Sequence, residues 1–335
     1  MSEVASVVND LEFQRRDTAK NFSPSVLRQH RYNRLTPMNT PDEPNAAIET
    51  PPDTTGPANC NQRAAPSRVV RLVAIDLDGT LLNDSKEVSE QTVNALCGLP
   101  ERGVRVVIAS ARPPRSVRHI YRKLKLDTWQ INYNGALIWD EQAQVAVFHR
   151  PLKAALVRSI IDQSRDMFEE VIVTCEVLDK WHTDRADDQL HTTETGRLFK
   201  PDFVGSLDEI CSQPITKLLL LGEEPLILRL EALLADEFSE AVSIVKTDRD
   251  MLQIMDRRVS KAVALKKVAS HYGIPVRHVM AIGDAPNDVG MLQLAGISIA
   301  MDNAHGLVKD VADWVAPSNN DHGVHAALKR YGMCD

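Results

Sequence analysis

The stretch that decides the fold is VVRLVAIDLDGT, residues 69–80. Residues 69–75 are apolar and β-branched over most of their length, which predicts a buried strand. Asp76 and Asp78 follow this strand directly, and Gly79 permits a close turn after them. Side chains two residues apart share a direction, so the two carboxylates can serve one site. Because open α/β sheets bind ligands beyond the carboxyl ends of their strands, the stretch also predicts where that site lies.

Predicted helices and strands alternate on both sides of this stretch. Toward the middle of the chain we expect helices over residues 89–99 and 115–123, and strands over residues 104–109 and 129–133. From Lys261 onward we expect helices over residues 261–272, 289–295 and 321–331, and strands over residues 279–282, 298–300 and 314–316. This alternation predicts an α/β fold with a Rossmann-like parallel sheet and right-handed crossovers.

Residues 151–255 break the alternation and predict an inserted α+β domain. Residues 152–168 have the spacing of an amphipathic helix, and a second helix is predicted over residues 226–238. Short apolar runs predict strands over residues 171–174, near Trp181, and over residues 215–221, 242–246 and 251–255. The catalytic core is then expected to consist of residues 67–150 and 256–335, joined from both sides of the insertion.

Residues 1–66 differ in composition from the rest of the chain. They hold eight of the 18 prolines and only one of the 15 glycines. Apolar periodicity is absent, and Asn, Thr and Ser separate the prolines. A segment of this kind cannot bury enough apolar surface to order itself, so we predict a disordered N-terminal extension.

The composition of the whole chain argues against several classes of protein. A net charge of −7 is unfavourable for a broad nucleic-acid-binding surface. The five cysteines are scattered without a CxxC pair, which favours buried thiols in a reducing compartment over a zinc site or a disulfide framework. The first residues carry acids rather than a basic start and an apolar run, and no apolar run is long enough for a bilayer. We therefore expect a cytoplasmic protein with neither nucleic-acid nor membrane partners.

A hydroxyl and a guanidinium follow the second predicted strand. Ser110 comes directly after residues 104–109 and could donate to a phosphoryl oxygen. Arg112 could bind a substrate phosphate or carboxylate with two hydrogen bonds. Taken singly, a serine at a strand end is more often a local cap, and the arginine could equally lie on the surface.

A lysine and two more acids come from the C-terminal third of the chain. Asp284 follows the strand predicted over residues 279–282, where it could bind a hard cation together with Asp76. Asp288 could join this site through water or orient Lys261, which opens a predicted helix. The competing interpretation of Asn287 and Asp288 is that they cap the next helix, and a lone lysine is usually solvated.

Taken together, four carboxylates, one hydroxyl and one ammonium predict phosphoryl chemistry. Asp76 would attack phosphorus and form an aspartyl-phosphate, and Asp78 would act as general acid and then as general base. Thr80, Ser110 and Lys261 would bind or neutralise the phosphoryl oxygens. A few carboxylates with water and substrate phosphate are what Mg²⁺ prefers, so Mg²⁺ is the expected cofactor. By itself the Asp-Leu-Asp pattern is equally consistent with a turn and a helix cap.

The chain resembles the haloacid dehalogenase superfamily, and most closely its Cof-like (type IIB) sugar-phosphatase branch. The resemblance rests on DLDGTLL at 76–82, Asn134-Gly135-Ala136, VSKAVAL at 259–265, GDAPND at 283–288 followed by Met291-Leu292, and Asn303-Ala304. It extends over most of residues 68–335. In that branch a type-2 cap lies between the second and third motifs, which is where residues 151–255 lie.

The resemblance implies a role for each matching residue. Asp76 is the implied nucleophile, Asp78 the acid/base, and Ser110 and Lys261 the groups that stabilise the phosphate. The implied metal ligands are Asp76, Asp284, Asp288 and Asp78, the last through its backbone carbonyl. The candidate substrate-binding residues are Thr80, Arg112, Asn134, Gly135 and Asn287.

The sequence thus predicts a Mg²⁺-dependent phosphatase acting on a small phosphorylated metabolite, with a sugar phosphate foremost. Two alternatives stay open at this point: a phosphomutase, and a regulatory or binding protein that keeps the fold. The insertion would select the substrate, and its polar candidates are Glu176, His182, Asp184, Arg185 and Lys217.

Overall fold

The computed structural model describes residues 69–191 and 194–335. The predicted extension over residues 1–66, and Cys60 with it, lies outside the described residues. The four cysteines in the described part are all free thiols, with Cys175 and Cys211 buried and Cys97 and Cys334 partly buried. None of the helices described has the length and apolar character needed to cross a membrane.

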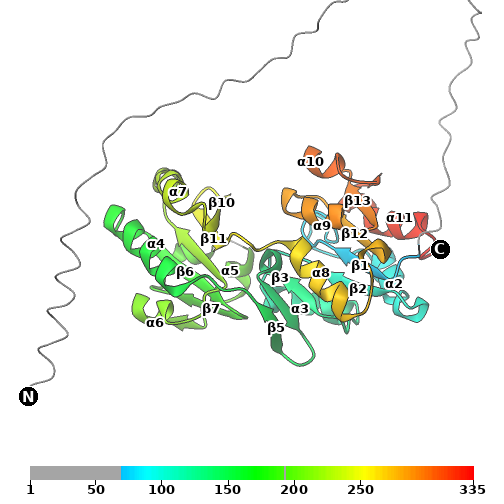
Figure 1. Cartoon of the computed structure of the whole chain (residues 1–335), viewed down its shortest axis with the longest axis horizontal. Helices are drawn as coiled ribbons and strands as arrows, with labels where there is room; N and C mark the ends of the chain where they lie inside the picture. Colours follow the sequence, from blue (N-terminus) through cyan, green and yellow to red (C-terminus); the bar gives the residue numbers. More distant parts are fainter. Residues whose placement is uncertain (1–68, 192–193) are drawn as a thin grey trace, which may run out of the picture. The chain divides into compact units, whose positions relative to one another are not determined.

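A five-stranded parallel sheet is built from both ends of the described chain, as the alternation predicts. The strand order is β14-β13-β12-β1-β2. The strands are β1 (Leu72–Ile75), β2 (Arg105–Ile108), β12 (Val279–Gly283), β13 (Ile297–Met301) and β14 (Trp314–Ala316). Figure 1 shows β1 and β2 beside β12 and β13, although about 170 residues separate the end of β2 from the start of β12 in the sequence.

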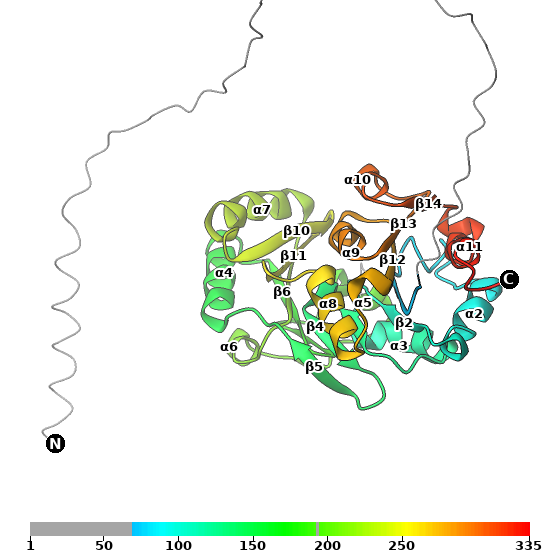
Figure 2. The same cartoon turned by 45° about the vertical axis from the view of Figure 1, so that its right-hand side comes forward.

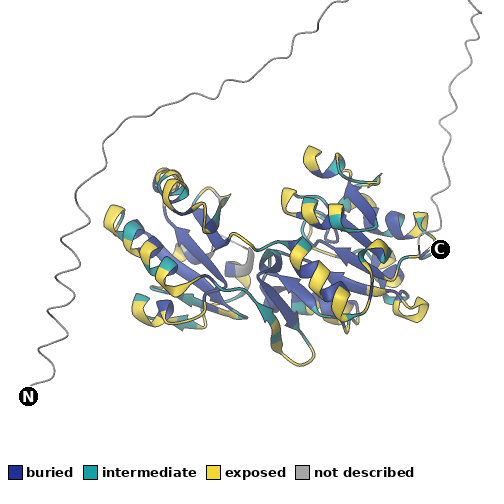
Figure 3. Ribbon diagram, viewed as in Figure 1, coloured by how far each residue is buried: buried dark blue, intermediate teal, exposed yellow. Residues whose placement is uncertain are grey.

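Helices cover both faces of this sheet because side chains alternate along each strand. Val73 and Ile75 point toward α2, α3 and α11, whereas Leu72 and Ala74 point toward α8, α9 and α10. The helices are α2 (Glu90–Cys97), α3 (Pro114–Lys123), α8 (Lys261–His271), α9 (Val289–Leu294), α10 (Gly306–Lys309) and α11 (Gly323–Arg330). Figure 3 shows the strands buried and the outer helix faces exposed. This is the doubly wound arrangement expected of an α/β fold.

The strand expected over residues 129–133 differs from the prediction in its partners. It forms as β3 (Gln130–Asn132), but it pairs antiparallel with β4 (Leu137–Asp140), which pairs with β5 (Val145–His149). A single parallel bridge between Ala109 and Ile131 connects it to the end of β2. The chain reverses at Asn134, which has a positive φ of 55°, so a tight turn replaces the crossover helix that a parallel strand would need.

Most of the expected insertion forms its own six-stranded sheet, in the order β10-β11-β9-β6-β7-β8. Its strands are β6 (Ile172–Val177), β7 (Lys180–Thr183), β8 (Phe203–Val204), β9 (Lys217–Leu221), β10 (Val242–Asp248) and β11 (Met251–Asp256). Helices α4 (Ala154–Met167), α6 (Leu207–Cys211) and α7 (Glu224–Phe238) pack on one face through a shared apolar cluster. Figure 2 shows α4 and α7 along that side of the sheet. The exact limits of a separate domain here stay a prediction.

Several short elements have no counterpart in the sequence analysis. Besides β8, α6 and α10 they include α5 (Glu194–Leu198) and the 3₁₀ turns η1 (Pro100–Arg102), η2 (Tyr133–Gly135), η3 (Asp188–His191), η4 (Val276–His278), η5 (Pro286–Asp288) and η6 (Asn319–Asp321). The helix expected over residues 89–99 ends at Cys97, because Gly98 caps α2 and Pro100 starts a new turn.

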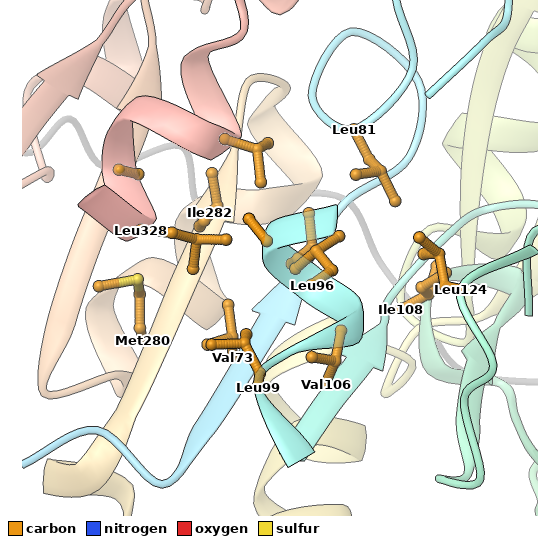
Figure 4. Close-up of a cluster of buried hydrophobic side chains, with 14 of the residues drawn as sticks. Val73, Leu81, Leu96, Leu99, Val106, Ile108, Leu124, Met280, Ile282 and Leu328 are labelled. Carbon is orange, nitrogen blue, oxygen red and sulfur yellow. The ribbon is translucent and has the colours of Figure 1, made fainter. Parts of the chain in front are cut away.

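Leu96 lies at the centre of the core between α2 and the parallel sheet (Figure 4). Its side chain is fully buried. We expect Leu96→Ala to lower the free energy of unfolding by about 2–5 kcal/mol, because the lost methyl groups leave a cavity in a packed core. Leu228→Ala on α7 removes the same atoms from a residue that is 47% exposed, and should cost less than about 0.5 kcal/mol. Urea unfolding of the two variants measures both, and equal losses would contradict the assigned core.

Candidate active site

The parallel sheet places three predicted site residues at one edge. Ile75 at the end of β1 pairs with Ile282 of β12 on one side and with Ile108 of β2 on the other. The backbone N–H of Asp76 still donates to the carbonyl of Ile282, at 3.0 Å, so the loops begin side by side. Asp76, Ser110 and Asp284 are therefore brought together by strand register.

Lys261 links two of the predicted acids. Ser260 caps α8 by accepting a hydrogen bond from Val263, so Lys261 is the first residue of that helix. The ammonium is buried and donates to Asp76 Oδ1 at 2.5 Å and to Asp288 Oδ1 at 2.7 Å. Burial opposes the charged lysine, but the two carboxylates outweigh it and hold the pKa of Lys261 above its ordinary value.

Asp76 and Asp284 are carboxylates whose pKa values are raised by burial and by neighbouring carboxylates. Burial raises the pKa of Asp76 above its usual range; Lys261 opposes this shift, and Asp288 and Asp284 add to it. Burial also raises the pKa of Asp284, although Thr80 lowers it by donating from Oγ1 to Asp284 Oδ1 at 2.6 Å. A buried pair of this kind favours a cation close by.

Asp288 holds the loop after β12 in place. Its Oδ2 accepts hydrogen bonds from the backbone N–H groups of Asp284 and Ala285, at 3.1 and 3.0 Å, while Oδ1 accepts from Lys261. Both oxygens of this fully buried carboxylate are therefore engaged. Of the two roles considered for Asp288, the geometry favours orienting Lys261.

Three carboxylates form a group that could hold a metal ion. Asp76, Asp284 and Asp288 each offer an oxygen, and these atoms lie within 4.8 Å of one another. The carboxylate of Asp78 is not in this group, so any contribution from Asp78 to a metal would come from its backbone carbonyl, as the resemblance implies.

Two cations hold the carboxylate of Asp78. Arg112 donates from Nε to Oδ2 at 2.7 Å and from Nη2 to Oδ1 at 2.6 Å, and Lys86 donates to Oδ1 at 2.7 Å. Burial would raise the pKa of Asp78, but Arg112 and Lys86 together hold it below its usual value. Arg112 was expected to meet substrate, whereas here it fixes Asp78. Nothing in the sequence singled out Lys86, because an isolated lysine in a loop is usually solvated.

The remaining predicted substrate-binding residues divide into two kinds. Asn134 and Asn287 are joined by a side-chain hydrogen bond of 2.9 Å and line a cleft with Lys261. Gly135 is structural: it has a φ of +100°, and a Cβ there would lie 2.4 Å from the carbonyl oxygen of Ser260. The buried Ser110 accepts a hydrogen bond at Oγ from the backbone N–H of Arg112, at 3.1 Å.

The cleft has a volume of about 600 Å³ and two unlike walls. Asn134, Lys261 and Asn287 line it on the side of the parallel sheet. Ser243 and Thr247 of β10 are among the residues that line it on the side of the six-stranded sheet. The arrangement can hold a small polar molecule against the buried ammonium and acids.

The polar candidates of the insertion also separate in the structure. Asp184 forms an ion pair with Arg165, and Arg185 donates to the backbone carbonyls of Glu170 and Val171. His182 packs against the ring of Phe203. These three candidates hold the six-stranded sheet together, whereas Glu176 and Lys217 line a cavity on it.

Strand-end acids around a buried lysine, on a doubly wound sheet with an insertion, define a class of phosphate-handling hydrolases. Residues 73–328 match the family described as haloacid dehalogenase-like hydrolase, and the chain belongs to this family. The predicted resemblance is therefore confirmed.

Several known proteins similar to the chain are named phosphatases. It is 31% identical over 267 residues to 5-amino-6-(5-phospho-D-ribitylamino)uracil phosphatase YitU of Bacillus subtilis (strain 168), covering 78% of this chain and 97% of that protein. The crystal structure of TM0651 from Thermotoga maritima matches with a TM-score of 0.72 and 26% identity, covering 78% of this chain and 97% of that one. The subclass IIB sugar phosphatase BT4131 shares the fold, with a TM-score of 0.65 and 19% identity over 79% of this chain and all of that one. The chain is an enzyme of this phosphatase class.

Gly79 offers a sharp test of the site geometry. It has a φ of +82°, and a Cβ there would lie 2.4 Å from Asp284 Oδ2. We expect Gly79→Ala to lower phosphatase kcat on the order of a hundredfold, because a shift of about 1 Å in a reacting group can cost that much.

Gly103→Ala is the matched control for Gly79→Ala. Gly103 has a similar φ of +74°, but nothing lies within 4 Å of its added Cβ. Both variants strain left-handed backbone and should lose thermal stability, Gly79→Ala more because of its added contact with Asp284, whereas only Gly79→Ala should lose activity. Equal activity in the two variants would show that the approach of Gly79 to Asp284 is unimportant.

Proposed function

We propose that this enzyme is a Mg²⁺-dependent phosphatase that hydrolyses a small phosphorylated metabolite through an aspartyl-phosphate on Asp76. The observation that carries the proposal is the buried Lys261 ammonium, which contacts Asp76 and Asp288 while Asp284 lies within the same group. This arrangement concentrates positive charge beside a strand-end carboxylate, which is what attack on a phosphate monoester requires.

The donor set fits Mg²⁺. All three side chains offer hard oxygen ligands, which Mg²⁺ binds together with water and substrate phosphate. Asp76 and Asp284 are the direct ligands we propose, because both oxygens of Asp288 are already engaged. When bound, Mg²⁺ would offset the charge on the phosphoryl oxygens and the repulsion between Asp76 and its substrate.

Asp76 and Asp78 divide the chemistry. Lys261 holds Asp76 by Oδ1, and the carboxylate attacks phosphorus, forming one O–P bond as the bond to the leaving oxygen breaks. In the enzyme without substrate, Arg112 and Lys86 hold Asp78 as a carboxylate, so it can give a proton to that oxygen only after it has released one of these cations and taken up a proton from solvent. Asp78 then takes a proton from the water that cleaves the aspartyl-phosphate. The ammonium of Lys261 and the hydroxyl of Ser110 would stabilise the transferring phosphoryl group.

The substrate we propose is a sugar phosphate or a related phosphorylated polyol. The cleft of about 600 Å³ is the right size for a small metabolite, and Asn134, Asn287, Ser243 and Thr247 offer hydrogen-bonding groups along it. The names of two similar proteins, the ribitylamino-uracil phosphatase YitU and the sugar phosphatase BT4131, point to the same kind of compound. We propose that residues 151–255 act as the cap that selects it.

Replacing the proposed nucleophile should abolish turnover without unfolding the enzyme. In Asp76→Asn we expect phosphate release from sugar phosphates to fall by a factor on the order of 10⁴ or more, as loss of the nucleophile does in other covalent enzymes. Asp208→Asn removes a carboxylate whose side chain is 87% exposed, and it should be fully active. Substantial turnover by a folded Asp76→Asn enzyme would rule out the aspartyl-phosphate route.

Metal removal tests the proposed Mg²⁺ site. We expect a chelator to abolish phosphate release and added Mg²⁺ to restore it. In Asp284→Asn the Mg²⁺ concentration for half-maximal activity should rise about tenfold or more, because one of two direct ligands loses its charge. Asp208→Asn again serves as control. Unchanged activity of the wild-type enzyme after exhaustive chelation would contradict the metal site.

A further inference from the structure

A second cavity lies on the face of the six-stranded sheet that α4 and α7 leave uncovered. It has a volume of about 90 Å³. Its walls are mainly apolar side chains of a small buried cluster: Trp181, Leu190, Leu219, Leu221 and Met251. Pro113, three residues after Ser110, also lines it. The cavity therefore adjoins the loop that carries the proposed phosphate-binding hydroxyl.

Two charged residues face this cavity from neighbouring strands. Glu176 of β6 and Lys217 of β9 stand directly opposite each other in the antiparallel register, and both line the cavity. Cross-strand neighbours of opposite charge usually pair. Glu176 and Lys217 do not form an ion pair, because the carboxylate of Glu176 already accepts hydrogen bonds from other residues.

Arg115 and Tyr133 take up the hydrogen-bonding capacity of Glu176. The guanidinium of Arg115 donates to both carboxylate oxygens, at 2.8 and 2.7 Å, and the single hydroxyl proton of Tyr133 is shared between Oε2 at 3.1 Å and the carbonyl of Leu178 at 2.8 Å. The ion pair is buried, with side chains 7% and 5% exposed. A guanidinium that donates two parallel hydrogen bonds holds a carboxylate more strongly than an ammonium does. Glu176 therefore pairs with Arg115 rather than with Lys217.

Lys217 is a buried residue whose ammonium opens onto the cavity. The residue is 9% exposed, and none of the described residues accepts a hydrogen bond from its ammonium, which the cavity leaves within reach of a small molecule. Nζ lies over the face of the Tyr133 ring, 5.2 Å from the ring centre. Thr174 is not a substitute acceptor, because its hydroxyl is already bonded to Trp181 Nε1 and to the carbonyl of His182. An ammonium in a small, mainly apolar cavity is poorly hydrated, so a ligand oxygen would gain a charge-assisted hydrogen bond there.

We propose that Lys217 binds an oxygen on a carbonyl or carboxylate carbon in the leaving group of the substrate. This inference rests on the proposed phosphatase function and names the chemistry that the cavity selects. The apolar walls accept the carbon skeleton, and the ammonium donates to the oxygen. An alcohol would bind less tightly, because a hydroxyl oxygen is a weaker acceptor for an ammonium than a carbonyl or carboxylate oxygen.

Two matched pairs of substrates test the proposal. 6-Phosphogluconate and glucitol 6-phosphate differ only in a carboxylate against a hydroxymethyl group. 5-Amino-6-(5-phospho-D-ribitylamino)uracil and ribitol 5-phosphate differ in a ring that bears carbonyls. In at least one pair, wild-type kcat/KM should favour the first member by about tenfold to a hundredfold, the range for a hydrogen bond to a charged donor. The pair that shows the preference identifies the source of the oxygen.

Lys217→Met should erase this preference, chiefly through a higher KM for the first member. The alcohol members should keep their kcat/KM within about threefold. Lys217→Arg should restore part of the preference. Lys180→Met removes the same charge from a side chain that is 66% exposed on β7, and should behave as wild type.

Three results would overturn the role of Lys217. They are no preference in the wild-type enzyme for either pair, an unchanged preference in Lys217→Met, or equal losses in Lys217→Met on all four compounds. The wild-type comparison decides even where the variant does not fold. If none of the four compounds releases phosphate, this result contradicts the proposed phosphatase function rather than the role of Lys217. Calorimetric binding of 6-phosphogluconate and of the uracil compound to wild type and Lys217→Met would then decide the role of Lys217 separately.

Discussion

The structure depends on one buried ammonium. Lys261 lies between Asp76 and Asp288, and three carboxylates crowd within 4.8 Å around this point. Without a cation, acids so close together and so buried would have to take up protons or separate. The same contact connects β1, which precedes the insertion, with α8, which follows it. It therefore assembles the site at the point where pairing of β1 with β12 joins the two halves of the parallel sheet.

The backbone is shaped to let these charges meet. The parallel register sets Asp76, Ser110 and Asp284 at one edge, and positive φ at Gly79 and Gly135 allows the loops to approach without side chains between them. The edge of the parallel sheet forms one wall of the cleft. The six-stranded sheet forms the other wall, because residues of β10 and β11 line the cleft together with Lys261. Chemistry thus comes from the parallel sheet, and we propose that selection comes from the insertion.

The sequence predicted the parts whose cause is local. An apolar run followed by acids predicts a strand and a site at its end, and amphipathic spacing predicts α4 to within two residues at either end. Nothing local could assign Arg112 to Asp78, or Glu176 to Arg115, because those partners are distant in the chain and are chosen by packing. The hairpin around Asn134 was missed although Asn134-Gly135 is a local turn signal, because the strands that follow the turn, β4 and β5, were not predicted. The sequence left two roles open for Asp288, a water-mediated metal contact and the orientation of Lys261. The loop after β12 favours the second, because both oxygens of Asp288 already accept hydrogen bonds.

The central claim is that Asp76 carries the phosphoryl group. The most direct test is to quench the wild-type enzyme in acid during steady-state turnover of a sugar phosphate and to locate the added phosphoryl mass by peptide sequencing in a mass spectrometer. The account predicts that the label lies on Asp76 and is removed by hydroxylamine, as an acyl phosphate is. A label on Ser110, or turnover with no phosphorylated residue at any quench time, would contradict it.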